Sequence, residues 1–346
     1  YLTQAEYQSE KSKPLRSVQN GDFVSFKANL PPRDYFTDEI RRQLSRDFGE
    51  GEFFSGGFTV RATIDPKMQV VAARALRSQL ELYDRARGVW HGSELTIDPS
   101  QLTEDGLWRA ALAEIRISRD IFLSEKWRPA VVLQVSQNNA RIGIEDVEDD
   151  SDGHWISAKD VTWAGKRRKD GSKGPKAKRA GDLLSVGDVV LVRKLLRDDG
   201  SFVRWSLRQI PKVQGAFVAM DVNNGRVIAM QGGFSYQHSV FNRATQAKRQ
   251  PGSNFKPFVY ASALDSGYSP ATIVIDAPIE VDTPQGVWSP KNSSSKFYGP
   301  TPLRTGIEQS RNLMTVRLAR EVGLDVIADY AEKFGVYDRM DRFLAV

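Results

Sequence analysis

Alternating apolar and polar residues predict β-structure in the middle of the chain. After Trp90-His91-Gly92, apolar side chains recur at every second position in short segments separated by polar stretches. We predict strands at 130–135, 140–145, 155–163, 189–195 and 202–210. Short strands joined by long hairpin tips favour a small antiparallel barrel, most similar to an OB-fold.

A further hairpin is predicted downstream of this barrel. Apolar runs at 214–222 and 226–231 flank the turn residues Asn223-Asn224-Gly225. Asn-Gly between two apolar runs is a strong hairpin signal, because both residues accept the positive φ angles of a tight turn.

Capping signals and periodicity predict helices in the first part of the chain. Thr3-Gln4-Ala5-Glu6 is a capping box for a short helix that ends before Pro14. Residues 16–57 are predicted to be a linker with one helical stretch at 37–48, and residues 58–64 alternate as a strand.

Asp65-Pro66 provides an N-cap followed by a proline in the first turn, and therefore starts a longer helix. One side of this helix carries an apolar stripe: Met68, Val71, Ala72, Ala75, Leu76 and Leu80. We predict that the stripe is core and has no binding role.

The composition is typical of a globular protein and excludes several classes. The 346 residues are 40% hydrophobic and 27% charged, which is sufficient for two or three domains with a sizeable core. The absence of cysteine excludes a disulfide framework and thiol catalysis. No run of about 18 apolar residues occurs, so no segment is expected to span a bilayer.

The net charge of +6 is unevenly distributed. Residues 145–152 (EDVEDDSD) are acidic, whereas residues 166–179 (KRRKDGSKGPKAKR) are strongly basic. Both stretches are poor in apolar residues, so we predict solvated hairpin tips or mobile loops. A functional alternative is that the basic stretch contacts anionic lipid headgroups, an anionic polymer or an acidic partner.

Ser253 and Lys256 form the most informative pair in the sequence. They lie three residues apart in RQPGSNFKPF, at the predicted start of a helix, so their side chains share one face. A serine hydroxyl is a weak nucleophile that needs a base, and a lysine can be that base if burial lowers its pKa. Ser-x-x-Lys is therefore a signature of serine acyl transfer.

The same spacing occurs at Ser293 and Lys296, within SPKNSSSKFYGP. This serine-rich, proline-flanked stretch is predicted to be a loop, where a three-residue spacing does not place two side chains on one face. We therefore assign the chemistry to Ser253 and Lys256.

A second candidate cluster is Ser310-Arg311-Asn312, which precedes an amphipathic helix. The Ser310 hydroxyl can relay a proton between the lysine and a leaving amine. The Asn312 amide can hold a peptide carbonyl while donating toward the lysine. Ser136-Gln137-Asn138 has the same spacing but lies in a polar turn between two predicted strands, so context favours Ser310 and Asn312.

Other classes of active site have no support in the sequence. His91, His154 and His238 share no metal-ligand spacing, and we expect each on the surface or in a loop. No Gly-x-Ser-x-Gly elbow, Gly-x-x-x-x-Gly-Lys loop or Gly-x-Gly-x-x-Gly pattern occurs. We therefore predict no metal and no cofactor.

These motifs lie in segments that resemble a known family. Residues 241–279 (FNRATQAKRQPGSNFKPFVYASALDSGYSPATIVIDAPI) and 298–336 (YGPTPLRTGIEQSRNLMTVRLAREVGLDVIADYAEKFGV) resemble the transpeptidase domain of class A high-molecular-weight penicillin-binding proteins. GGFTVRATIDPKMQVVAARAL resembles the entry into that domain, and YLTQAEYQSEKSKPL resembles the end of a glycosyltransferase domain. Members of this family are bifunctional, membrane-anchored enzymes that polymerise and crosslink peptidoglycan.

The resemblance implies an α+β fold. It comprises a penicillin-binding-protein/β-lactamase-like transpeptidase domain, with helices around an antiparallel sheet, and an OB-like β-barrel insertion. The hairpin at 214–231 would then provide central strands against which the Ser253 helix packs. The expected parts are the end of a glycosyltransferase domain (1–15), a linker (16–57), a first transpeptidase segment (58–90), the OB-like insertion (91–212) and the main transpeptidase segment (213–346).

Carried over position by position, the resemblance makes Ser253 the acylated nucleophile and Lys256 its general base. Ser310 becomes a proton relay and Asn312 a substrate-binding amide. The oxyanion hole would use the backbone N–H of Ser253 and one N–H from a strand. The family's third motif, Lys-Thr/Ser-Gly, does not occur in this sequence, so we expect the chain to be an internal piece of a longer protein.

The implied function is peptidoglycan D,D-transpeptidation, by serine acyl transfer from D-Ala-D-Ala, with β-lactams as covalent inhibitors. The implied partners are stem peptides and lipid-linked glycan strands, and a longer parent would also polymerise glycan. An upstream anchor would hold the protein on the periplasmic side of the bacterial inner membrane. A wall-synthesis regulator docked on the barrel is a further expected partner.

Two alternatives remain open. A D,D-carboxypeptidase or a β-lactamase-like hydrolase shares the serine and lysine chemistry, since the outcome depends on whether water or an amine reaches the acyl-enzyme. A non-catalytic OB-type module would bind nucleic acid or a regulator through basic residues and the aromatic residues Trp127, Trp155, Trp163 and Trp205. Because strand aromatics at period two are usually core, we predict no nucleic-acid partner.

Overall fold

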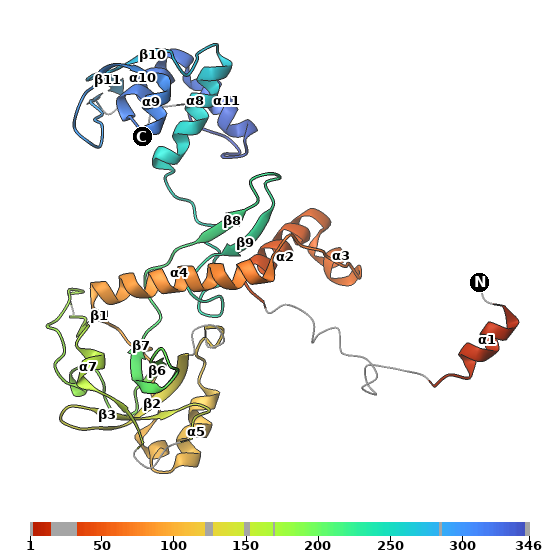
Figure 1. Ribbon diagram of the computed structural model, residues 1–346, viewed down its shortest axis with the longest axis vertical. Helices are drawn as coiled ribbons and strands as arrows, with labels where there is room; N and C mark the ends of the chain where they lie inside the picture. The colour runs from red at the N-terminus through yellow and green to blue at the C-terminus, as the bar shows by residue number, and fades with distance from the viewer. Residues whose placement is uncertain are drawn as a thin grey trace. The chain divides into compact units, whose positions relative to one another are not determined.

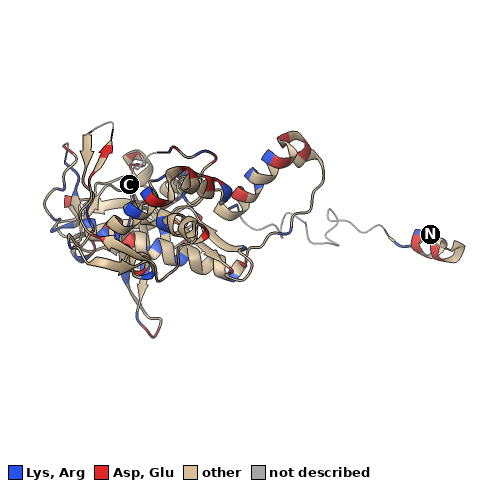
Figure 2. Ribbon diagram, turned by 90° about the horizontal axis from the view of Figure 1, so that it is seen from above, with Lys and Arg blue, Asp and Glu red and all other residues tan. Residues whose placement is uncertain are grey.

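A computed structural model describes residues 3–14, 33–121, 127–148, 153–168, 170–283 and 286–342 (Figure 1). The chain divides into two compact units, Tyr1–Ala247 and Lys248–Val346. Acidic and basic residues are interspersed along the described elements (Figure 2). The two charged runs of the sequence lie only partly within the described residues, since 149–152 and 169 fall outside them.

Helices of the first unit begin where the sequence provides caps. The Thr3 hydroxyl accepts a hydrogen bond from the Glu6 N–H at 3.4 Å, and Asp34 caps the next helix through the Thr37 N–H at 2.9 Å. Because Asp34 is the cap, the helix predicted at 37–48 starts two residues earlier. The helices of this unit are α1 (Gln4–Lys11), α2 (Tyr35–Phe48), α3 (Glu50–Ser55), α4 (Pro66–Arg87), α5 (Asp105–Glu114) and α7 (Ala158–Val161), with 3-10 turns η2 (Pro99–Leu102) and η3 (Ala180–Asp182).

The predicted antiparallel barrel is confirmed as a five-stranded sheet in the order β4-β3-β2-β6-β7. The edge strands β4 and β7 contact each other, with the His154 and Trp205 rings 5.8 Å apart, so the sheet nearly closes (Figure 1). Its interior is apolar and includes the buried Trp205. Trp127 is buried in a neighbouring apolar cluster with Leu80 and Phe234. The strands are β2 (Trp127–Val135), β3 (Ala140–Ile144), β4 (His154–Ile156), β6 (Val189–Leu196) and β7 (Phe202–Arg208).

Helix α5 covers part of this sheet because a glycine allows a close approach. The position that a Cβ of Gly143 would occupy lies 2.6 Å from ring atoms of Trp108, so only glycine leaves room for the indole. Trp108 is 1% exposed, and it joins Leu112 and Val131 in the core between α5 and β2.

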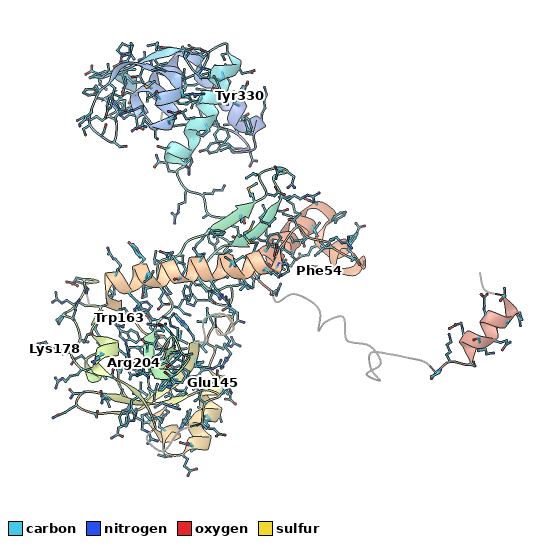
Figure 3. All side chains as sticks on the ribbon, viewed as in Figure 1. Phe54, Glu145, Trp163, Lys178, Arg204 and Tyr330 are labelled. Atoms are coloured by element: carbon cyan, nitrogen blue, oxygen red, sulfur yellow. The ribbon has the colours of Figure 1, made fainter. Side chains whose placement is uncertain are left out.

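The predicted strand at 155–163 is wrong beyond Ile156. The chain turns instead into α7, because the Ser157 hydroxyl bonds the Asp160 carboxylate at 2.7 Å and holds a helical turn. Asp160 is 2% exposed and accepts a hydrogen bond from Arg204 Nε at 2.9 Å (Figure 3). After this turn, β5 (Gly165–Lys166) forms a short parallel pair with β1 (Val89–Trp90), which lies earlier in the chain.

The predicted hairpin is confirmed; in the described part of the chain its two strands form a sheet of their own, and their expected place at the centre of a larger sheet stays a prediction. Strands β8 (Phe217–Met220) and β9 (Val227–Gln231) form a two-stranded sheet that contacts α4 and, through β9, α2. The outer edge of β9 is covered by a side chain: Gln69 of α4 donates to the Met230 carbonyl at 2.8 Å and accepts from the Met230 N–H at 2.9 Å. The amide of Gln69 therefore replaces a neighbouring strand.

The contacts between α4 and β9 explain why two further predictions, the strand at 58–64 and the core stripe of α4, differ from the structure. Residues 58–64 form no strand; they run beside β9, and the Asp65 N–H bonds the Ile228 carbonyl at 2.9 Å. The predicted core stripe of α4 is only partly buried, since Met68 is 39% and Val71 55% exposed and Ala75 is also exposed. The buried side is rotated toward Gln69 and Arg77, because Arg77 Nε donates to the Phe234 carbonyl at 2.7 Å.

The second unit is a helical cluster with two small sheets. Helix α8 packs on α10 and α11, because its apolar side chains Val259, Tyr260 and Ala263 share a core with these helices. The expected packing of this helix against the hairpin at 214–231 stays a prediction. The elements are η4 (Gly252–Phe255), α8 (Lys256–Asp265), α9 (Leu303–Glu308), α10 (Asn312–Val322) and α11 (Leu324–Lys333), with strand pairs β10 (Ile273–Asp276) and β13 (Gly299–Pro302), and β11 (Val281–Thr283) and β12 (Gly286–Trp288).

We expect Gln69→Leu to destabilise the first unit by roughly 2–4 kcal/mol, because it leaves the Met230 N–H and carbonyl unpaired in a buried position. Urea unfolding followed by tryptophan fluorescence measures the change. Gln79→Leu, on the exposed side of the same helix, is the matched control and should change stability little. Equal stability of both variants would contradict the role assigned to Gln69.

Candidate functional site

The predicted nucleophile and base lie on consecutive turns at the start of α8. Ser253 belongs to the 3-10 turn η4, and Lys256 is the first residue of α8, with its N–H bonded to the Ser253 carbonyl. Pro257 falls in the first helical turn, as predicted, where its missing N–H costs little. Lys256 is 6% exposed, whereas Ser253 is exposed.

The Lys256 amine connects α8 to the junction between α9 and α10. Its Nζ donates to the Ser310 carbonyl at 2.7 Å, to Ser310 Oγ at 3.0 Å and to Asn312 Oδ1 at 2.6 Å. The structure thus brings together three of the four predicted residues, although Ser310 and Asn312 lie more than fifty positions after Lys256 in the sequence.

The fourth predicted residue, Ser253, is exposed. Among the residues that the structure describes, none forms a hydrogen bond with Ser253 Oγ. An ammonium group has three protons and no lone pair, and all three protons of Lys256 have acceptors. Three acceptors around Nζ accommodate an ammonium, whereas a neutral amine keeps two N–H donors and gains a lone pair.

Burial lowers the pKa of Lys256, because desolvation disfavours the charged amine. Beside the amine lies a cavity of about 340 Å³, lined largely by apolar side chains of α8, α10 and α11, among them Val259, Val316 and Ile327. Lys256 Nζ therefore has three hydrogen-bond acceptors, while the apolar surroundings lower its pKa.

Asn312 is oriented differently from the prediction. Its Oδ1 accepts from Lys256, and its Nδ2 donates to the Lys291 carbonyl at 2.9 Å. The expected donation from this amide toward the lysine is wrong, because a cationic amine takes the acceptor end of an amide.

Ser310 has an unusual backbone conformation. Its φ is +52°, in the left-handed region that residues with a Cβ rarely adopt. This conformation lets the carbonyl and the hydroxyl of one residue both reach Lys256 Nζ. Strain of about 1 kcal/mol at a left-handed residue is a recurring feature of functional sites.

Asn292 was not predicted from the sequence as a residue of this site. Its Oδ1 accepts from the N–H of Asn312 at 2.9 Å and of Leu313 at 3.3 Å, at the start of α10. The only signal was an asparagine in a turn-rich stretch, which does not show that it caps a helix twenty positions away.

The competing motif copies lie outside the site. Ser293 and Lys296 are exposed in a loop, as predicted. Ser136 lies in the predicted turn, with its N–H bonded to the Asn139 carbonyl at 2.8 Å.

The three histidines belong to the first unit, whereas Lys256 belongs to the second. His154 is in β4 and not in a loop, packed edge-on against Trp205, and burial lowers the pKa of the half-buried His91. His238 is exposed. In the described part of the chain, no group of acidic, histidine or cysteine side chains is arranged to hold a metal ion.

Comparison with known proteins identifies two domains. The profile described as "Penicillin-binding protein OB-like domain" matches residues 90–213, and "Penicillin binding protein transpeptidase domain" matches residues 215–343. The chain is 36% identical to penicillin-binding protein 1A of Vibrio cholerae over 97% of its length, and 31% identical to that of Escherichia coli, also over 97%.

A solved structure of penicillin-binding protein 1A from Haemophilus influenzae aligns with 99% of the chain at a TM-score of 0.70 and 29% identity. The chain spans less than half the length of these proteins: 39% of the Vibrio relative, 37% of the Escherichia relative and 46% of the Haemophilus chain.

We expect Lys256 to titrate below the usual lysine pKa of about 10.4, because desolvation penalises its charged form. Carbon-13 NMR of the lysine ε-carbon as a function of pH measures the midpoint, and Lys256→Arg assigns the signal. A midpoint at or above the usual value would show that the three acceptors outweigh desolvation.

Proposed function

Because the chain belongs to the class A penicillin-binding proteins, we propose that it carries the serine acylation site of a peptidoglycan D,D-transpeptidase. One observation carries the proposal. The buried Lys256 amine is held between Ser310 and Asn312, one turn beyond the exposed Ser253 hydroxyl. A nucleophile, a desolvated base and a second hydroxyl are the groups that acyl transfer requires.

Deprotonation of Lys256 starts the reaction. A neutral amine keeps two N–H donors, which match the Asn312 Oδ1 and Ser310 carbonyl acceptors, and gains a lone pair. The lone pair takes the proton of Ser253 Oγ as the oxygen attacks the carbonyl of the D-Ala–D-Ala bond. Such base catalysis contributes about two to four orders of magnitude in rate.

The remaining steps complete the transfer. The backbone N–H of Ser253, with one further N–H from a strand, stabilises the oxyanion. Ser310 passes a proton from Lys256 to the nitrogen of the departing D-alanine, leaving an ester on Ser253. An amine of a neighbouring stem peptide then attacks this ester, forming the crosslink and restoring the serine. A β-lactam enters by the same first step and leaves a stable acyl-serine.

A hydrolytic role is the second candidate for the same site. If water in place of an amine resolves the ester, the product is that of a D,D-carboxypeptidase or a β-lactamase. Because Ser253 is exposed, both water and an amine can reach its ester. The match to a transpeptidase domain favours the amine as acceptor. A nucleic-acid module receives less support, because Trp127 and Trp205 are buried and offer no stacking surface.

The wider role follows the relatives. We infer that the complete enzyme works on the periplasmic side of the bacterial inner membrane, on stem peptides and lipid-linked glycan strands, and that it also polymerises glycan. Its parts in this chain would be the end of the glycosyltransferase domain (1–15), a linker (16–57), a first transpeptidase segment (58–90), the OB-like insertion (91–212) and the main transpeptidase segment (213–346). The barrel would dock a regulator. Within the described residues, no helix is both long and apolar enough to cross a bilayer.

We expect Ser253→Ala to abolish covalent labelling of the full-length gene product by fluorescent penicillin, because the acylated oxygen is removed. Lys256→Ala should slow labelling by roughly two to four orders of magnitude. Gel fluorescence after timed exposure measures both. Ser293→Ala and Lys296→Ala carry the same changes in the exposed copy of the motif and should label normally; normal labelling of Ser253→Ala would refute the assignment.

Ser310 variants separate chemistry from backbone strain. We expect Ser310→Ala and Ser310→Gly to slow acylation by roughly two orders of magnitude, because both remove the relaying hydroxyl. Their stabilities should differ, since glycine suits a φ of +52° and alanine does not. Thermal unfolding should therefore rank the glycine variant above the alanine variant; fast acylation by either would exclude the relay.

A further inference from the structure

The loop that carries the exposed motif copy also holds the start of α10. Arg311, the N-cap residue of this helix, makes no side-chain capping bond. Asn292 caps the helix from outside, since its Oδ1 accepts from the N–H groups of Asn312 and Leu313. Asn292 is 4% exposed, so these otherwise unpaired donors are satisfied in a buried position.

A buried carboxylate fixes the orientation of Asn292. Asp276, at the end of β10, is 0% exposed, and its Oδ1 accepts from Asn292 Nδ2 at 2.7 Å. The same Nδ2 donates to the Lys296 carbonyl at 3.0 Å, so both ends of the amide are engaged. Arg311 Nε lies 4.0 Å from Asp276 Oδ2 and offsets part of the buried charge.

The same loop also holds the side chain of Asn312. The carbonyl of Lys291 accepts from Asn312 Nδ2 at 2.9 Å, while Asn292 binds the Asn312 backbone. Asn312 is therefore gripped at two points, and its remaining polar atom, Oδ1, lies 2.6 Å from Lys256 Nζ. A continuous path of hydrogen bonds runs from Asp276 through Asn292 and Asn312 to the amine.

We propose that Asn292, oriented by Asp276, is a positioning residue for the acylation site: it fixes Asn312 and thereby the Lys256 amine. The proposal rests on the proposed function of that site. Asn292 contacts neither the nucleophile nor the base, so it acts through Asn312. A displacement of about 1 Å in such a support lowers the rate of a reaction by about a hundredfold.

Loss of this support has an effect on Lys256 that general destabilisation lacks. If Asn312 moves away, the ammonium loses one acceptor, and its pKa falls further below the usual range. Among the described residues, no carboxylate bonds Nζ. The ionisable side chains nearby include Arg249 and Tyr337, which line the adjacent cavity, and Asp276 and Arg311, which lie behind Asn292. Tyr260 of α8 interacts with Asp276, and the Tyr298 ring contacts Arg311. None of these changes in the variants below except Asp276.

The test compares three variants of the full-length gene product. Asn292→Ala should slow labelling by fluorescent penicillin at least about tenfold and move the Lys256 midpoint to lower pH. Asn292→Asp should also slow labelling, because it places a second carboxylate against Asp276. The swap Asp276→Asn with Asn292→Asp restores one donor and one acceptor between the two positions, and should recover most of the labelling rate.

Ser293→Ala, in the same loop, is the matched control and should leave both readouts unchanged. Unchanged labelling and an unchanged Lys256 midpoint in Asn292→Ala would overturn the proposal. So would slower labelling without a shift of the midpoint, because that result indicates a structural role only. If Asn292→Ala fails to fold, the swap decides: recovery of rate and midpoint supports the proposal, and a folded swap without recovery overturns it.

Failure of the proposed function gives a different result. If the unmodified protein is not labelled at Ser253, the acylation assignment is lost. The Lys256 midpoint, measured by NMR in this chain, still reports whether Asn292 controls the amine.

Discussion

The second unit depends on burying one lysine amine. Lys256 is 6% exposed, and a buried amine requires acceptors for each of its protons. The Ser310 carbonyl, the Ser310 hydroxyl and the Asn312 amide provide them, and all come from the short connection between α9 and α10. The left-handed conformation of Ser310 and the shared core of α8, α10 and α11 are both consequences of keeping this connection over the first turn of α8.

The unit also buries a carboxylate, yet the two charges do not form a direct ion pair. Asp276 is 0% exposed, and Asn292 and Asn312 stand between it and Lys256. A carboxylate in contact with the amine would favour the ammonium and raise its pKa. Amide and carbonyl acceptors satisfy the protons without a full negative charge, so desolvation still lowers the pKa of Lys256. Two intervening amides thus reconcile a well-packed lysine with a lowered pKa.

Local patterns predicted what depends on neighbours in sequence. The capping box at Thr3, the N-cap at Asp65, most barrel strands and the hairpin at Asn223-Asn224-Gly225 all follow from short motifs. Short motifs also selected Lys256, Ser310 and Asn312, which the structure brings together, while the roles of the four site residues stay predictions. Features decided by distant contacts were missed or wrong. The strand at 155–163 gave way to a turn held by Asp160 and Arg204, the edge of β9 is covered by Gln69, and Asn292 caps a helix from twenty positions away.

The two copies of Ser-x-x-Lys show why spacing alone does not create a nucleophile. Ser293 and Lys296 have the same separation as Ser253 and Lys256, but they lie exposed in a loop, whereas Lys256 is buried. The loop nevertheless serves the other copy, because Lys291 and Asn292 hold Asn312 and the carbonyl of Lys296 holds Asn292. A sequence motif identifies candidate residues; burial and the hydrogen bonds around the amine distinguish the two copies.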